Sequence, residues 1–395
     1  MPADWIRLRA KNLGSSGSCD MKIALVHDYL REYGGAERVV ETLHEMWPSA
    51  PLFTAFVDWE HLGDQGYRFK DWDIRTSWVQ HNPIVKKFHS PLRFLAPKIW
   101  ESFNLSSYDV VISSSGWFIC RGVTVKKPAV HMCYIHHPPR NLYGYATGSN
   151  LQKYWFVRVY ATIINFFMRQ YDYNTAQAVD FFIANSQETA RRVKKFYRRE
   201  STVIYPPIEI SKGVTLQQPL QGHPLKRAYY LSVGRLTYSK RVDLAIEAAN
   251  KLKLPLKVVG TGPEEASLKA IARSTVEFLG SVSDSELAEL YTGARALIFC
   301  ALDEDFGMVP VEAMVHGTPV IALGQGGVLE TVVDGKTGVL FPESTVESLM
   351  AAIKKFDRTN KSDRYYKNCI EQAKKFSKER FKKELRAFVQ SHTSR

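Results

Sequence analysis

Residues 294–317 read ARALIFCALDEDFGMVPVEAMVHG, and this stretch decides the fold. Its first seven residues, 294–300, form an apolar run of strand length, the acidic loop that follows contains a glycine, and the run VEAMVHG at residues 311–317 is predicted to be helical. Strand, loop and helix in this order are part of a βαβ unit, in which ligands bind beyond the carboxyl end of the strand. The loop therefore marks a candidate binding site on a parallel sheet.

Two carboxylates frame this loop, Glu304 before its glycine and Glu312 in the early part of the helix. Carboxylates accept strong hydrogen bonds from sugar hydroxyl groups. The free backbone N–H groups of Gly307, Met308 and Val309 at the helix start would favour an anion. By itself, however, the pattern fits equally well a helix start that merely carries acidic residues.

A second strand-end motif precedes it in the chain, VGRLTYSKR at residues 233–241. Arg235 stands where the strand ends, and Lys240 where the next helix begins. Fixed cations at such a place can stabilise the negative charge of a departing diphosphate. Taken alone, this segment is better explained as two exposed cations on a loop.

Short apolar runs alternate with helical segments through both halves of the chain. They are MKIALVHDYL, YDVVISSS, AVHMCYIHH, DFFIANS and STVIYPP in the first half, and RAYYLSVG, LKVVG, VEFLG, ARALIFC, TPVIAL and TGVLF in the second. The alternation predicts an α/β protein of two doubly wound Rossmann-like domains that face each other across a cleft.

The domain boundaries follow from changes in composition. We expect a flexible N-terminal extension at 1–20, an N-terminal domain at 21–206, a linker at 207–227, a C-terminal domain at 228–345, and basic helices at 346–395 that pack back on the N-terminal domain. Met21 directly precedes the first strand and is expected to mark the edge of the folded unit.

Composition limits the kind of partner and the compartment. The net charge of +13 is shared by both halves and implies an anionic partner, for which nucleic acid, a membrane surface or a phosphorylated substrate would each serve. The five cysteines form no CxxC pair, which favours reduced, buried thiols and no structural zinc. No secretory signal is visible, and the longest apolar stretch, 154–168, is interrupted by Arg158 and too short to span a bilayer. We expect a cytoplasmic protein.

The two strand-end motifs together resemble those of glycosyltransferase family 4, the retaining enzymes of the GT-B fold. GRLTYSK and EDFGMVPVE occur in the order of that family. VVGTGPEEASLK, VEFLGSVSDSELAELYTGARALIF and TPVIALGQGGVLETVVDGKTGVLF also resemble family segments in the expected places. The resemblance covers nearly all of residues 21–350 and is most specific in the second half.

The resemblance implies roles for the matching residues. Arg235 and Lys240 would hold the donor diphosphate, Glu304 would contact the donor sugar, and Glu312 would bind the ribose. The Gly34-Gly35 pair of EYGGAERV matches the family loop that lies close to phosphate and acceptor. The implied donor site comprises Gly35, Arg235, Lys240, Gly262, Val282, Glu304, Phe306, Gly307, Met308, Val309 and Glu312; the catalytic set is His136, Arg235, Lys240 and Glu304, and the acceptor set is Gly34, Gly35 and Arg140.

The segment YIHHPPR, residues 134–140, resembles the branch of the family that contains mannosyltransferases of O-antigen and exopolysaccharide synthesis. It implies transfer of a hexose, foremost mannose from GDP-mannose, to a glycan or lipid-linked acceptor, without a metal or other cofactor. His137 departs from the usual Thr, and LYGY replaces a Trp-Asp pair. A UDP- or ADP-sugar donor or a nucleotide-sugar epimerase therefore stays an alternative.

Two other interpretations of the sequence are a metal-dependent enzyme and a nucleic-acid-binding protein. A D-x-D metal motif occurs at Asp71-Trp72-Asp73 and again at Asp303-Glu304-Asp305, but three-residue patterns arise readily by chance. A basic nucleic-acid-binding protein would interleave aromatic and basic residues on a groove, whereas here the motifs stand at strand ends. We therefore expect no metal and no nucleic-acid partner.

Two basic segments bear on membrane contact. Residues 81–100 contain Lys86, Lys87, Arg93 and Lys98 but no acidic residue, and aromatic residues such as Phe88, Trp100 and Phe103 lie within or just after them. This composition suits peripheral contact with an anionic membrane, although a partly buried helical hairpin is the alternative. The basic run 191–199 is expected to be an exposed helix face.

Overall fold

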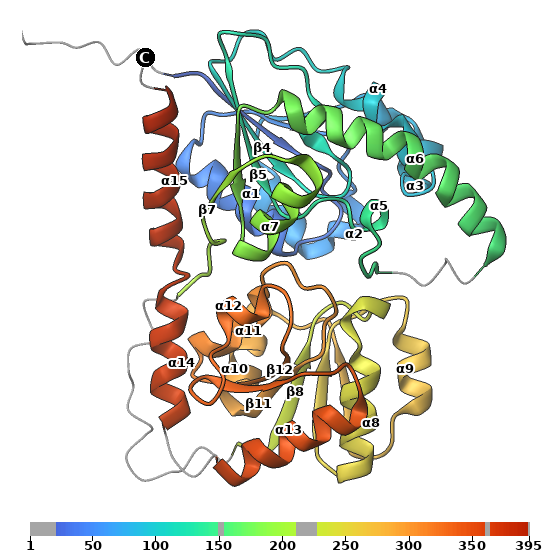
Figure 1. Ribbon diagram of the computed structural model, residues 1–395, viewed down its shortest axis with the longest axis vertical. Helices are drawn as coiled ribbons and strands as arrows, with labels where there is room; N and C mark the ends of the chain where they lie inside the picture. Colours follow the sequence, from blue (N-terminus) through green and yellow to red (C-terminus); the bar gives the residue numbers. More distant parts are fainter. Residues whose placement is uncertain (1–20, 149–153, 211–226, 360–363, 394–395) are drawn as a thin grey trace, which may run out of the picture.

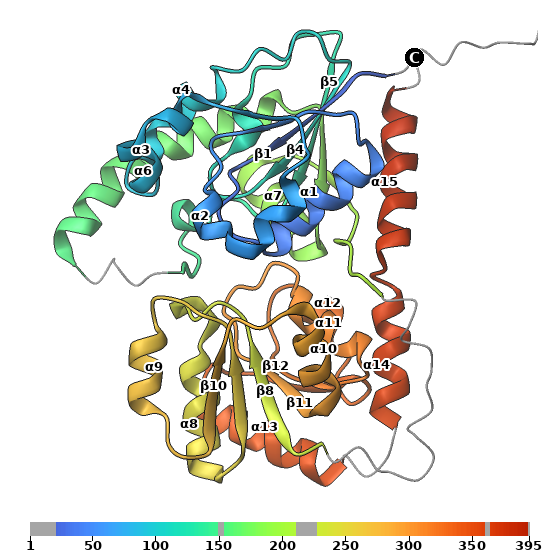
Figure 2. The same ribbon diagram turned by 180° about the vertical axis from the view of Figure 1, so that it is seen from behind.

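The computed structural model describes residues 21–148, 154–210, 227–359 and 364–393. The predicted extension at 1–20, with Cys19, and most of the predicted linker lie outside the described residues. Figures 1 and 2 show two α/β halves, one above the other, with α14 and α15 running along one side of both.

The N-terminal half contains a seven-stranded sheet in the order β3-β2-β1-β4-β5-β6-β7, and every neighbouring pair is parallel. Its strands are β1 Ile23–His27, β2 Leu52–Thr54, β3 Ile74–Thr76, β4 Val110–Ser115, β5 Val130–Ile135, β6 Phe181–Ala184 and β7 Ser201–Val203. The α-helices are α1 Gly35–Met46, α2 Trp59–Leu62, α3 Pro83–Lys87, α4 Ala96–Trp100, α5 Arg140–Tyr143, α6 Trp155–Ala178 and α7 Gln187–Tyr197. The central strands β1, β4 and β5 are buried along their whole length, as a parallel sheet covered on both faces requires.

The C-terminal half repeats this architecture with six parallel strands in the order β10-β9-β8-β11-β12-β13. They are β8 Tyr229–Val233, β9 Leu256–Val259, β10 Val276–Gly280, β11 Ala294–Phe299, β12 Val320–Leu323 and β13 Gly338–Phe341. Its α-helices are α8 Val242–Leu252, α9 Glu265–Ile271, α10 Asp284–Gly293, α11 Met308–Val315, α12 Val328–Thr331, α13 Val346–Thr359 and α14 Arg364–Lys374, and α15 Lys378–Thr393 follows them in the chain. The prediction of two doubly wound Rossmann-like sheets is confirmed.

The strand order reverses at one point in each sheet. In the N-terminal sheet the reversal lies between β1 and β4, and in the C-terminal sheet between β8 and β11. Ligands of doubly wound sheets bind at this switch point, because the loops on either side leave in opposite directions and open a crevice. The two strand-end motifs follow β8 and β11, so the topology brings them together although they are far apart in the sequence.

The last two helices belong to different halves of the molecule. α14 packs on α11, and Cys369 and Ala373 of α14 lie in the core of the C-terminal half. Phe381, Leu385 and Phe388 of α15 lie instead in the core around β1 and β4 of the N-terminal half. The chain crosses between the halves at residues 374–378, beside its earlier crossing, where Ile208 N–H donates to Phe376 O and Lys378 N–H donates to Ile208 O, both at 3.0 Å.

The burial predicted for the cysteines is found at the four that the structure describes. Cys120, Cys133, Cys300 and Cys369 are buried and form no disulfide bond with one another. In the parts of the chain that the structure describes, no helix combines the length and apolarity needed to cross a membrane.

The predicted membrane-contact segment is only partly exposed. It folds into α3, a 3-10 turn at Arg93–Leu95, and α4. Trp100 is fully buried and donates from its indole N–H to Phe118 O at 2.8 Å, while Phe103 packs edge-on against Phe53. The expectation of burial in a membrane interface is therefore wrong for Trp100, which fills the core beside β4, and Phe103 is partly buried against the same core. Phe88 remains exposed.

The packing of α15 predicts a large loss of stability when Phe381 is shortened. Phe381→Ala should lower the free energy of unfolding by about 3–5 kcal/mol, because it removes a wholly buried ring and leaves a cavity next to β1. Urea unfolding followed by fluorescence measures this change. Lys383→Ala, on the exposed side of the same helix, is the matched control and should stay within about 0.5 kcal/mol of the parent. Equal effects of the two substitutions would contradict the packing.

Candidate active site

The two loops at the C-terminal switch point meet through one ion pair. Lys240 Nζ lies 2.7 Å from Glu304 Oε2, and both side chains are partly buried. The backbone joins the loops as well, since Leu302 N–H donates to Ser239 O at 2.8 Å. The sequence-predicted residues Lys240 and Glu304 thus form one polar centre at the carboxyl edge of the sheet.

Glycines allow neighbouring loops to pack directly on this centre. A Cβ at Gly262 would lie 2.3 Å from Leu236 O, so no side chain fits between the 260–264 loop and the loop after β8. Gly326, whose φ of 61° favours glycine, packs against Glu304 O, to which the next residue, Gly327, donates its N–H at 2.8 Å. Gly262 therefore shapes the site through its backbone.

Two helix N-termini approach each other at the interface of the two halves. Gly307, with φ 88°, turns the chain into α11, which begins at Met308. On the other side α1 begins at Gly35, and a Cβ there would lie 2.7 Å from Met308 Sδ. Gly34 donates its N–H to Glu37 Oε2 at 2.9 Å and so starts α1. Both helix starts carry partial positive charge, which favours an anion between them.

The predicted donor residues with apolar side chains differ in what they can offer a ligand. The Phe306 ring is buried against Tyr205 and Phe376, so only its backbone is available to a ligand. Val282 and Val309 are partly buried at the edge of the C-terminal core. Shape and backbone groups are therefore what these positions contribute.

Ion pairs between the halves occupy two other predicted residues. Arg235 Nη1 lies 2.5 Å from Glu32 Oε1 across the interface, and both side chains are largely exposed. Glu312 is bound by Arg38 of α1 and also accepts from Tyr291 OH at 3.3 Å. Arg38 and Glu32 are not among the residues predicted from the sequence, although both flank the predicted Gly34-Gly35 loop.

A buried carboxylate next to Glu304 ties this loop to the N-terminal half. Asp305 Oδ2 lies 2.5 Å from Arg140 Nη2, and Asp305 Oδ1 lies 2.6 Å from Arg192 Nη1. Burial would raise the pKa of Asp305, but neighbouring cations, Arg140 foremost, bring it below the usual value. The expectation that the basic run 191–199 is simply an exposed face is wrong for Arg192, which is buried because it reaches Asp305.

The second D-x-D sequence is thus used for contacts between the halves. Asp305 binds two guanidinium groups, and Asp303 Oδ2 accepts from the backbone N–H of Ala146 at 2.8 Å. Within residues 21–148, 154–210, 227–359 and 364–393, no group of three or more His, Cys, Asp or Glu side chains is arranged to hold a metal ion. Arg140, predicted to bind the acceptor, lies at this interface with its guanidinium on Asp305.

His136 sits at the end of a buried chain of polar groups. Its Nε2 lies 2.7 Å from Ser114 Oγ, and Ser114 in turn contacts His27, whose Nδ1 is 3.1 Å from Ser114 O. His27 Nε2 lies 3.4 Å from Glu37 Oε1, which connects the chain to the start of α1. These partners come from β1, β4 and α1, and nothing in the linear sequence connects them.

Burial determines the charge state of His136. Loss of solvation, with smaller contributions from the charges of His27 and His137, lowers the pKa of His136 to about 3. The ring is therefore neutral at pH 7 and offers one N–H donor and one acceptor nitrogen. A neutral ring can bind a hydroxyl group without attracting the diphosphate.

This shift predicts how stability depends on pH. The unfolded chain protonates His136 below its ordinary pKa of 6.5, whereas the folded protein does not until about 3, so the unfolded state binds more protons in this window. Stability should therefore fall as pH decreases from 6.5 towards 3, by up to about 1.4 kcal/mol per pH unit from this group. Urea unfolding at several pH values measures the slope.

His136→Gln should flatten that slope relative to the parent. His131, whose pKa burial lowers to about 4, contributes in the same direction and stays in both proteins, so the difference isolates His136. Parallel slopes in parent and variant would show that His136 titrates normally in the folded protein.

The amino-acid sequence is similar to those of known sugar-transferring enzymes. Residues 33–212 match the family model described as Glycosyltransferase Family 4, and residues 215–376 match the model described as Glycosyl transferases group 1. The alpha-1,3/1,6-mannosyltransferase alg2 of Schizosaccharomyces pombe is 26% identical over 83% of this chain and 72% of its own length.

Solved structures share the fold. Anabaena HepE in complex with UDP superposes with a TM-score of 0.65 at 20% identity, over 94% of this chain and 100% of that one. Sucrose-phosphate synthase from Thermosynechococcus elongatus superposes with a TM-score of 0.69 at 17% identity, over 94% and 98% of the respective chains.

Proposed function

We propose, since the chain belongs to glycosyltransferase family 4, that it moves a hexose, foremost mannose from GDP-mannose, to a glycan or lipid-linked acceptor with retention of configuration. The observation that carries this proposal is the Lys240–Glu304 pair at the switch point, next to the start of α11. A cation for phosphate and a carboxylate for sugar hydroxyl groups stand there side by side.

The donor would bind across the interface of the two halves. Its diphosphate would lie between Arg235, Lys240 and the start of α11, and its sugar against Glu304. Its ribose hydroxyl groups would donate hydrogen bonds to Glu312. Donor binding would then break two ion pairs. Arg235 would leave Glu32 to contact the diphosphate, and Glu312 would leave Arg38 to contact the ribose.

The reaction we propose is a front-face displacement. The acceptor hydroxyl oxygen forms a bond to the anomeric carbon on the side from which the phosphate leaves. The bond between that carbon and the phosphate oxygen breaks, and the hydroxyl proton passes to the departing phosphate. No dedicated base is needed, so the protein contributes positioning and fixed charge, with neutral His136 as a candidate contact to the donor sugar.

The donor identity has two candidates that one binding experiment separates. The similarity to a mannosyltransferase supports GDP-mannose, and the fold shared with HepE, solved with UDP, keeps UDP-sugars as the second candidate. Thermal shifts with GDP-mannose, UDP-glucose, UDP-N-acetylglucosamine and ADP-glucose would rank them. A ligand at a hundredfold its Kd stabilises the fold by about 2.7 kcal/mol, which such a panel detects. A shift with UDP-glucose alone would overturn the mannose proposal.

The cation pair yields a test of the donor site. Arg235→Ala and Lys240→Ala should each lower kcat by about a hundredfold to a thousandfold, because each removes fixed positive charge from the developing phosphate anion. Initial rates of transfer measure the loss. Lys251→Ala removes a lysine that pairs with Glu347 away from the site, and it should keep parental rates.

Circular dichroism and thermal unfolding should show that the two site variants remain folded. Near-parental turnover in both would refute their assignment to the diphosphate. A loss in Lys251→Ala as large as in Lys240→Ala would mean that net charge, not position, controls the rate.

We further propose that transfer needs no metal ion, because Arg235, Lys240 and the starts of α1 and α11 supply the positive charge that a divalent ion would otherwise provide. Transfer rates in excess EDTA should match rates without it. Complete loss of activity that returns with added Mg²⁺ or Mn²⁺ would instead support a metal-dependent reaction.

The acceptor and the place of action complete the proposal. A lipid-linked acceptor would bring the enzyme to the cytoplasmic face of a membrane as a peripheral protein. The net charge of +13 supports attraction to anionic lipid there.

A further inference from the structure

The first part of α6, up to Phe167, is apolar on the side that faces away from the protein. Its buried side chains, Ala161, Asn165, Met168, Asp172 and Ala176, pack on the N-terminal half. A second set is exposed and consists of Trp155, Phe156, Val159, Ile163, Phe166 and Phe167, with Trp155 at 70% and Phe166 at 65% exposure. We call this second set the aromatic face.

The two sets lie on opposite sides of the helix. With about 3.6 residues per turn, the buried side chains fall on one arc and the aromatic face on another arc about 180° away. Polar residues normally occupy the outer side of a surface helix, and large exposed apolar patches mark interaction sites. The aromatic face is therefore a surface that lacks its partner.

The charges around the aromatic face have one sign. No Asp or Glu occurs from residue 154 to 171, and Arg158 and Arg169 stand along one edge of the aromatic face. Asp172, the first acidic residue of α6, is buried in an ion pair with Arg121. The surface can therefore attract anions without a repelling carboxylate on α6 itself.

The segment 81–100 lies next to α6 and carries exposed apolar and basic side chains of its own. Arg93 donates from Nη2 to Asn165 Oδ1 of α6 at 2.7 Å, so the 3-10 turn at Arg93–Leu95 lies against the helix. Ile84 and Phe88 add exposed apolar side chains next to Lys86 and Lys87. Figures 1 and 2 show α3 and α4 beside α6, whose start projects away from the N-terminal half.

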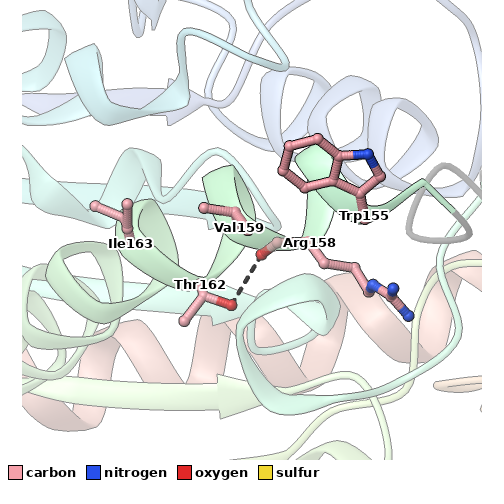
Figure 3. A pocket seen from close by; sticks show the side chains of 5 residues that line it. All are labelled: Trp155, Arg158, Val159, Thr162 and Ile163. Atoms are coloured by element: carbon pink, nitrogen blue, oxygen red, sulfur yellow. Dashed lines mark hydrogen bonds between the residues drawn. The ribbon is translucent and has the colours of Figure 1, made fainter.

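A hollow of about 330 Å³ lies on α6 itself, lined by Trp155, Arg158, Val159, Thr162 and Ile163. Figure 3 shows the Trp155 ring and the Arg158 guanidinium at one end of the hollow and Ile163 at the other, with Thr162 Oγ1 donating to Arg158 O at 2.8 Å. An indole and an aliphatic wall beside a guanidinium suit the boundary between lipid headgroups and acyl chains, where apolar rings bury and cations meet phosphate.

We propose that the aromatic face of α6 docks the protein on an anionic lipid membrane. A second copy of the chain is the other candidate occupant, and charge argues against it. A twofold contact places a patch against itself, so Arg158 and Arg169 would face the same cations of the partner without a carboxylate on α6 to neutralise them. An anionic bilayer complements the same charges.

Only the short helix α5 separates α6 from Asp305, which lies next to Glu304 in the candidate active site. Asn165 Nδ2 donates to Asn141 O at 3.0 Å, and Arg169 Nη1 donates to Leu142 O at 3.3 Å, so α6 rests directly on α5. α5 carries Arg140, the partner of Asp305 next to Glu304. A lipid-linked acceptor held at the membrane would therefore approach the site from the side that α6 presents.

The test measures binding of the whole protein to vesicles without donor or acceptor. The parent should sediment with vesicles of phosphatidylglycerol and phosphatidylcholine at low salt, and not with phosphatidylcholine alone. Phe166→Gln/Phe167→Gln should lower the vesicle partition coefficient by at least about tenfold. The matched control Ile271→Gln/Val333→Gln changes two exposed apolar residues of the C-terminal half and should bind as the parent does.

A second pair of variants tests the charges. Arg158→Gln/Arg169→Gln should weaken binding to the anionic vesicles and reduce its salt dependence, whereas Lys354→Gln/Arg358→Gln, exposed on α13, should not. Parental binding by the Phe166/Phe167 variant, or no binding by the parent, would overturn the proposal. A parental dimer that the Phe166/Phe167 variant dissolves, without vesicle binding, would assign the face to a second copy instead.

This docking can fail without the proposed function failing. Donor binding, measured by thermal shift in the same variants, should be parental, because the aromatic face is separate from Lys240 and Glu304. A variant that loses vesicle binding but still binds the donor would support the docking surface alone. A parent protein that does not bind the donor would refute the proposed function instead.

Discussion

The carboxylate of Asp305 holds two guanidinium groups of the N-terminal half, Arg140 and Arg192, and the position of the loop between β11 and α11 depends on this contact. All three side chains are at least largely buried, so removing the carboxylate would leave two cations without their shared partner in a poorly solvated place. Because Glu304 is the preceding residue and α11 begins three residues later, the same contact sets where the Glu304 carboxylate and the helix start stand relative to α1.

The other contacts between the halves differ from this one in strength. The Arg235–Glu32 pair is exposed on both sides, and pairs of that kind contribute about 0–1 kcal/mol. Arg235 can therefore exchange Glu32 for another anion at little cost. Asp305 has no such freedom, because its partners would lose a buried ion pair. The interface thus combines a permanent anchor with contacts that a ligand can replace.

Sequence reasoning captured what is local or topological and missed what depends on how the halves pack. Apolar runs that alternate with helices predicted both sheets, and the strand ends predicted the meeting of Lys240 with Glu304. Arg192, Arg38 and the chain from Glu37 to His136 could not be found, since their partners lie on other elements or in the other half. Trp100 was misassigned because a basic, aromatic composition does not reveal which rings face the core. For the same reason, the composition of the apolar stretch at 154–168 did not show that α6 has one buried face and one exposed apolar face.

The two crossings between the halves lie side by side and are joined by backbone hydrogen bonds, Ile208 to Phe376 and Lys378 to Ile208. Two neighbouring attachments on one edge behave mechanically like the leaves of a single hinge. Both covalent connections between the halves therefore lie on one edge, and elsewhere the halves meet through noncovalent contacts alone. Any separation of the sheets must then grow with distance from that edge. α14 and α15 mark the hinge edge, and the start of α6 lies on the opposite edge, so the widest excursion would occur where α6 projects.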